Sequence, residues 1–66
     1  MFQVTLYRPE GDGMLTEFAT LRISTDGKMV LSPAKAVEKR IIERIRDDVI
    51  AGKVRGEVEG IVWETM

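Results

Sequence analysis

Apolar and polar residues alternate along residues 2–7, and this period of two predicts a half-buried β-strand. Residues 8–13 contain two glycines and a proline, which predict a loop. The alternation resumes over residues 15–24 as a second strand. Asp26–Gly27 then predicts a type I′ hairpin turn into a short third strand at residues 29–31. The side expected to face the core carries Phe2, Val4, Leu6, Ala19, Leu21 and Ile23.

Residues 32–52 change to apolar spacings of three and four, which predict an amphipathic helix over about 33–51. Ser32 is a suitable N-cap, and proline is favoured at the first helical position, where Pro33 would stand. Gly52 suits the left-handed residue that follows a helix end. The apolar stripe of this helix is expected to contain Ala34, Val37, Ile41, Ile42, Ile45 and Val49.

Glu57–Thr65 predicts the last strand, and Gly60 within it indicates a bulge or a close approach of another backbone segment. A bulge there would place Val58, Ile61 and Trp63 on one face. One helix against these strands predicts a single α+β domain over residues 1–66. The expected architecture is a small two-layer ββ(β)αβ unit on a mostly antiparallel sheet of three or four strands. A right-handed crossover leaves two positions for the last strand, beside the strand before the helix or beside the first strand.

The chain has more apolar residues than one helix covers. Tyr7, Phe18 and Trp63 are expected on the sheet face opposite the helix, where they would form an exposed apolar patch. A domain of 66 residues also has a thin margin of stability on its own. We therefore expect a homodimer through the open sheet face, with these three residues as self-association candidates. In the alternative interpretation, the aromatics cover the sheet rim singly and need no partner.

The composition limits the chemistry that this chain can perform. Neither cysteine nor histidine occurs, so no thiolate or imidazole is present to bind zinc or to act as a general base. No glycine-rich phosphate-binding motif occurs, and the carboxylate pairs Asp47–Asp48 and Glu57/Glu59 fit solvated surfaces. We expect no catalytic, metal or cofactor site, and no enzyme. With no membrane span, signal-peptide pattern or cysteine, we expect a cytoplasmic protein without membrane contact.

Charge is unevenly distributed, although the formal net charge is only −1. Residues 33–55 carry seven basic and four acidic residues, whereas residues 56–66 carry three acidic residues and no basic ones. The seven basic residues are Lys35, Lys39, Arg40, Arg44, Arg46, Lys53 and Arg55. They predict either a contact surface for a protein or for nucleic-acid phosphates, or a solvent face neutralised by salt bridges to Glu43, Asp47 and Asp48.

These patterns favour a small non-catalytic interaction or regulatory module, homodimeric, with the helix surface as the site for a partner. The alternative is a nucleic-acid-binding protein that uses the seven basic residues. A third arrangement, in which Tyr7, Phe18 and Trp63 stack on RNA bases beside Arg22, lacks the motif of known RNA-binding sheets.

Overall fold

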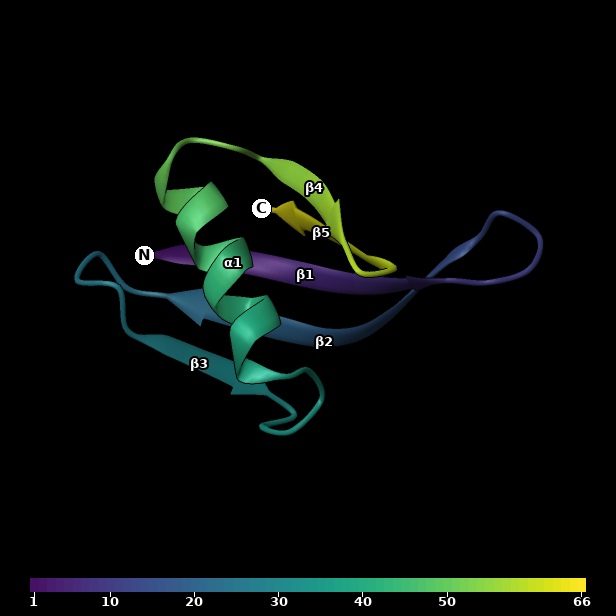
Figure 1. The fold of residues 1–66 in the computed structure, drawn as a ribbon, viewed down its shortest axis with the longest axis horizontal. Coiled ribbons are helices and arrows are strands. Elements are labelled where there is room, and N and C mark those ends of the chain that lie inside the picture. Colours follow the sequence, from purple (N-terminus) through teal and green to yellow (C-terminus); the bar gives the residue numbers. More distant parts are fainter.

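The computed structural model describes residues 1–66 and contains five strands and one helix (Figure 1). In chain order the elements are β1 (Phe2–Pro9), β2 (Leu15–Ile23), β3 (Met29–Ser32), α1 (Lys39–Ile50), β4 (Arg55–Val58) and β5 (Ile61–Thr65). The strands form one sheet in the order β3-β2-β1-β5-β4, and every neighbouring pair is antiparallel. The predicted α+β fold is confirmed, with five strands in place of three or four.

The first strand lies at the centre of the sheet. Of the two positions left open for the last strand, the structure takes the one beside β1, which pairs with β5 through Leu6 and Trp63 among others. The two edges are formed by β3 and β4, each only four residues long. Figure 1 shows α1 lying across one face of the sheet, so the opposite face has no covering layer.

The core lies between α1 and this face of the sheet. The predicted alternation is confirmed for Val4 and Leu6 in β1 and from Ala19 to Ile23 in β2, whereas Phe2, also expected in the core, is 38% exposed. The predicted helical stripe is confirmed from Ile41 to Val49. Full burial of each aliphatic side chain of this size contributes roughly 1.5–3 kcal/mol. The cluster consists of Val4, Leu6, Ala19, Leu21, Ile23, Ile41, Ile42, Ile45, Val49, Val58 and Trp63.

The helix begins at Lys39, and the prediction that it begins at Pro33 is wrong. Ser32 is the last residue of β3 and does not cap the helix. The N-cap position belongs to Glu38, whose side chain makes no capping hydrogen bond. Residues 33–38 form an irregular connection instead.

The position of this connection explains why the helix starts late. At Ser32 the chain is at an edge of the sheet, and it must rise to the second layer before a helix can cross the sheet. The Ser32–Pro33 peptide bond is cis, and the Ala36 N–H donates to the Pro33 carbonyl at 3.1 Å, which closes a turn. Ala36 and Val37 pack against the core from this loop.

The hairpin between β2 and β3 lies where the sequence predicts it, but the turn type differs. Gly27 has a positive φ of 89°, whereas Asp26 does not, so the predicted type I′ turn is not formed. The Asp26 carboxylate accepts hydrogen bonds from the Ser24 hydroxyl and from the Lys28 N–H. These bonds stabilise the turn through the side chain of Asp26, without a left-handed backbone at that residue.

A turn with positive φ at both central residues occurs between β4 and β5. Glu59 has φ 47° and Gly60 has φ 82°. The prediction that Gly60 is a bulge within one long strand is therefore wrong. Gly60 helps to reverse the chain, and the expected single strand Glu57–Thr65 is instead the end of β4, a two-residue turn and β5, with Val58 opposite Ile61.

Candidate functional site

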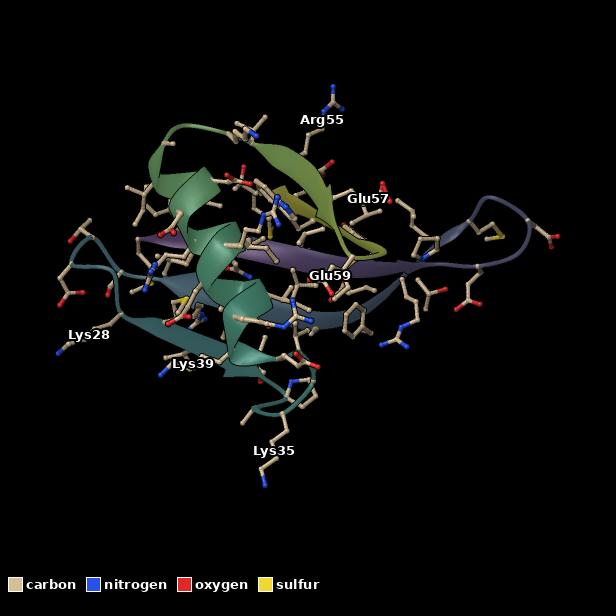
Figure 2. All side chains as sticks on the ribbon, viewed as in Figure 1. Lys28, Lys35, Lys39, Arg55, Glu57 and Glu59 are labelled. Atoms are coloured by element: carbon tan, nitrogen blue, oxygen red, sulfur yellow. The ribbon has the colours of Figure 1, made fainter.

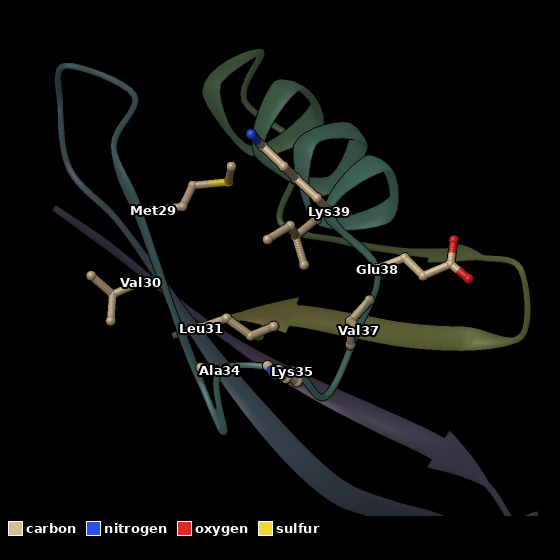
Figure 3. A pocket seen from close by; sticks show the side chains of 9 residues that line it. Met29, Val30, Leu31, Ala34, Lys35, Val37, Glu38 and Lys39 are labelled. Carbon is tan, nitrogen blue, oxygen red and sulfur yellow. The ribbon is translucent and has the colours of Figure 1, made fainter.

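The most apolar hollow on the surface lies between β3 and the start of α1 (Figure 3). Its volume is about 620 Å³, and its apolar lining consists of Met29, Val30, Leu31, Ala34, Val37 and Ile42. Figure 3 shows Met29 and Leu31 projecting from β3 toward the side where Val37 and the helix lie, while Val30 points the opposite way. We call this hollow the β3 groove.

The β3 groove adjoins a free edge of the sheet, because β2 is the only strand next to β3. At the start of this ladder, the Ser24 N–H donates to the Lys28 carbonyl at 2.9 Å. Hydrogen-bonded pairs alternate along an antiparallel ladder, so the backbone groups of Val30 also point toward β2. Those of Met29 and Leu31 point outward, away from the sheet. Met29 and Leu31 thus combine unpaired backbone N–H and C=O groups with side chains that border the groove.

The rim of the β3 groove carries more basic than acidic residues. Lys35 and Lys39 line it and form no ion pair within the chain. The acidic residue of the lining, Glu38, is paired with Arg40 at 2.9 Å. Lys28, the residue before β3, has a side chain that is 86% exposed and lies 4.0 Å from the Asp26 carboxylate. Figure 2 shows the three lysines distributed around β3 and the first turn of α1.

Arg40 is the most strongly paired of the seven basic residues that the sequence singles out. Its guanidinium donates to both carboxylate oxygens of Glu59, one of them at 2.9 Å from Nη2, and it also donates to Glu38. Hydrogen bonding to Glu59 raises the pKa of Arg40, and the same bonds lower the pKa of Glu59. The Arg40–Glu59 pair therefore links the first turn of the helix to the β4–β5 turn.

The other predicted contact residues do not lie in one stripe. Lys35 is in the loop before the helix, so it does not share a helix face with Lys39 and Arg46. Arg46 pairs with Asp47 at 3.2 Å. Arg44 is close enough to Glu59 to lower the pKa of that carboxyl further.

Beyond the helix, Lys53 lies in the loop that follows Gly52, and Arg55 is the first residue of β4. Arg40 and Arg46 are thus salt-bridged, but only Arg46 pairs with one of the predicted acids, Asp47, and neither Glu43 nor Asp48 forms an ion pair. Lys35 and Lys39 both line the β3 groove. Lys53 and Arg55 lie apart from both places and form no ion pair.

Two of the three aromatic self-association candidates lie on the helix side of the sheet. Trp63 stands directly opposite Leu6, is fully buried, and belongs to the core. Phe18 is the extra residue of a bulge, because Leu6 pairs with Ala19 while Tyr7 pairs with Glu17. The bulge turns Phe18 toward the core, against which it packs. The predicted aromatic patch of the open face is therefore not formed.

Phe18 is also covered by a charged neighbour from β1. The Arg8 guanidinium carbon lies 4.6 Å from the centroid of the Phe18 ring, which is the geometry of a cation–π contact.

Tyr7 is the one aromatic candidate on the open face. It borders a hollow of about 630 Å³ together with Leu15 and Val62, and the hollow is also lined by the charged residues Arg55, Glu57 and Glu64. A sheet face with this mixture of residues differs from the continuous apolar row on which the homodimer prediction was based. The homodimer itself stays a prediction.

The structure contains no group of three or more acidic side chains placed to hold a metal ion. Every buried side-chain nitrogen or oxygen has a hydrogen-bond partner. The only helix, α1, lacks the length and apolar character that crossing a membrane requires.

No pattern in the sequence predicts the β3 groove. Residues 29–31 are predicted as a short strand, but the strand order does not follow from the sequence, so the free edge of this strand is visible only in the fold. The late helix start, which frees Ala34 and Val37 to line the groove, was also unforeseen. Comparisons of this chain with protein-family models, with curated proteins and with solved structures found no match.

Proposed function

We propose that this protein is a small non-catalytic interaction module that binds an extended segment of a partner protein along β3. The observation that carries this proposal is the coincidence of free peptide groups and an apolar groove at Met29 and Leu31. Recognition by strand addition uses both features, because main-chain hydrogen bonds supply affinity and pockets for alternate side chains supply specificity.

The groove favours a particular chemistry in the bound segment. Residues paired with Met29 and Leu31 would place their side chains on the helix side of the sheet, against Val37 and Ile42. Apolar side chains fit there. Lys35 and Lys39 on the rim favour a segment that also carries acidic residues. The proposed ligand is therefore an extended acidic peptide with apolar residues at alternate positions.

A displayed peptide library that alternates apolar with acidic or basic residues tests this proposal. We expect enrichment of the acidic peptides. A synthetic peptide from the enriched set should shift the NMR amide signals of Met29 and Leu31 in the labelled protein. Absence of any enrichment, or shifts that spare β3, would overturn the proposed function.

Charge reversal on the rim supplies the matched control. Lys35→Glu and Lys39→Glu should each weaken binding of the acidic peptide by roughly twofold to fivefold, the range typical of an exposed ion pair. Lys53→Glu changes the same charge at an exposed position away from the groove and should leave binding unchanged. Equal losses in all three variants would indicate a general charge effect and contradict a site at β3.

Nucleic acid serves as the comparison ligand, because the seven basic residues predict nucleic-acid binding as the alternative function. A single-stranded oligonucleotide that binds more tightly than the acidic peptide, with affinity falling steeply as salt rises, would favour that alternative. We also propose that this module is located in the cytoplasm.

A further inference from the structure

β4 forms the second free edge of the sheet, and its sequence is self-complementary. The run Val54–Val58 has Gly56 at its centre, Arg55 and Glu57 on either side, and valine at both ends. When two copies of this run pair antiparallel about Gly56, each arginine lies opposite a glutamate and each valine lies opposite a valine. This is the pattern that a two-fold antiparallel contact requires.

The backbone of β4 has the matching arrangement. The Thr65 N–H donates to the Val54 carbonyl at 2.8 Å, so the polar groups of Val54 point toward β5. By the alternation of an antiparallel ladder, those of Gly56 also point inward, and those of Arg55 and Glu57 point outward from the sheet. The outward-pointing N–H and C=O groups thus belong to the residues on either side of Gly56. A two-fold contact centred on Gly56 can therefore pair them with the same groups of a second copy.

We propose that two copies of this chain pair through their β4 edges, antiparallel, around a two-fold axis at Gly56. Arg55 then stands opposite Glu57 of the partner subunit in two symmetric hydrogen-bonded pairs, which supply about four backbone hydrogen bonds in total. The two glycines face each other on the axis. The two sheets join into one continuous sheet that spans both subunits.

The side chains of β4 favour this contact. Neither Arg55 nor Glu57 has an ion-pair partner within the chain, and Figure 2 shows both projecting outward from β4. Glu64 stands opposite Arg55 in the β4–β5 register and forms no ion pair with it. Across the two-fold axis, Arg55 and Glu57 neutralise each other.

The helix side of β4 contributes an apolar contact. Val54, at one end of the run, is 63% exposed, whereas Val58, at the other end, is part of the core. In the antiparallel contact centred on Gly56, Val54 lies opposite Val58 of the partner subunit, which would cover it.

The other edge of the sheet is a poor site for a second copy. Lys35 and Lys39 lie beside β3 without ion pairs, and a two-fold contact there would add the same two lysines of the second subunit. Like charges on an edge strand discourage self-pairing. Opposite charges placed symmetrically about a glycine, as in β4, permit it. The inference is independent of the β3 groove, because it uses the opposite edge of the sheet.

Sedimentation equilibrium of the full chain over micromolar to millimolar concentration tests the contact. We expect a monomer–dimer equilibrium that weakens as salt rises. Arg55→Glu and Glu57→Arg each replace two favourable pairs by two like-charge pairs, so each should raise the dimer dissociation constant by about tenfold. Asp12→Arg, a charge reversal in the loop between β1 and β2, away from both sheet edges, should leave the constant unchanged.

Two further measurements separate the proposed contact from a loss of folding. The double variant Arg55→Glu/Glu57→Arg restores opposite charges across the axis and should dimerise like the natural chain. An equimolar mixture of the two single variants should form heterodimers, since one chain then carries only acidic and the other only basic side chains at positions 55 and 57. A natural chain that stays monomeric throughout, or single variants that dimerise as well as the natural chain, would overturn the proposal.

Discussion

Gly56 lies against the indole ring of Trp63, so closely that a Cβ on Gly56 would be 2.9 Å from Cζ2 and 3.0 Å from Nε1 of the ring. The two residues stand opposite each other in β4 and β5. Trp63 is fully buried, and its ring occupies the space that any side chain at position 56 would need. Glycine inside this strand is therefore a packing requirement of the core.

Gly56→Ala should destabilise the fold by about 1–3 kcal/mol, the usual cost of one methyl group forced into a filled core. For a domain of this size, each kcal/mol lowers Tm by about 4–8 °C. Trp63 is the only tryptophan, so its fluorescence during urea unfolding reports the change directly. Gly11→Ala is the control, because a Cβ there meets no atom within 4 Å and Gly11 has no positive φ. A Gly56→Ala variant as stable as Gly11→Ala would contradict this packing.

The Arg40–Glu59 pair should make stability depend on pH in the acid range. The pKa of Glu59 is lowered in the folded state from its ordinary value of 4.5. The stabilisation is therefore complete above pH 4.5 and is lost as the pH falls through the lowered value of the folded state. Arg40→Gln should reduce stability slightly at neutral pH and not at all in strong acid.

Urea midpoints measured against pH test this expectation, with Lys53→Gln as a control whose side chain has no ion pair. Asp26 also has a lowered pKa, because it accepts hydrogen bonds from Ser24 and Lys28, and it contributes to the same acid range in every variant. The difference between Arg40→Gln and the natural chain removes the contribution of Asp26 and reports the ion pairs that Arg40 makes with Glu59 and Glu38. A difference that persisted unchanged in strong acid would show that Arg40 stabilises the fold by other means.

Lys39→Gln should stabilise the protein while weakening its proposed binding function. The first turn of α1 contains basic and no acidic residues, which opposes the helix dipole. Removal of one such charge is worth about 0.3–1 kcal/mol. Lys35→Gln removes a lysine from the same rim but outside the helix, so it should weaken peptide binding without raising Tm. Equal thermal shifts in both variants would exclude the dipole as the cause.

Hydrogen exchange should alternate along both edge strands. We expect fast exchange for the amides of Met29 and Leu31, which point outward, and slow exchange for Val30, which is bonded to β2. In β4, Arg55 and Glu57 should exchange fast in dilute solution and become protected as the concentration rises, because dimerisation engages them. NMR-detected exchange at two concentrations measures both effects. Concentration-dependent protection at Met29 and Leu31 instead would place the contact at β3.

The local patterns of the chain predicted the elements well where a single physical signal dominated. Alternation in β1 and β2 and the spacing from Ile41 to Val49 identify the core faces, because burial of apolar surface outweighs other terms there. The start of the helix was mispredicted because Ser32 and Pro33 suit a helix cap locally, while the tertiary path requires a crossing loop. Asp26–Gly27 suited a type I′ turn, yet the hydrogen bonds of Asp26 select another.

The binding surfaces depend on relationships that no local pattern contains. Trp63 was expected on the open face because the chain has more apolar residues than one helix covers, whereas the structure places Trp63, with Val58 and Ile61, on the helix side. A bulge at Phe18 reverses the expected side of that residue. The free edges of β3 and β4 follow from the strand order, which is set by long-range pairing.

The pairing of β1 with β5 has a consequence for how this protein reaches its native state in the cell. The strand made first, at the middle of the sheet, waits for a neighbour that is made more than fifty residues later. A nascent chain can therefore form the β1–β2–β3 half early, but its central strand keeps one side unpaired until β5 leaves the ribosome. Completion of the sheet thus depends on the last strand of this domain to be made, and a chain that lacks β5 would leave β1 unpaired on one side.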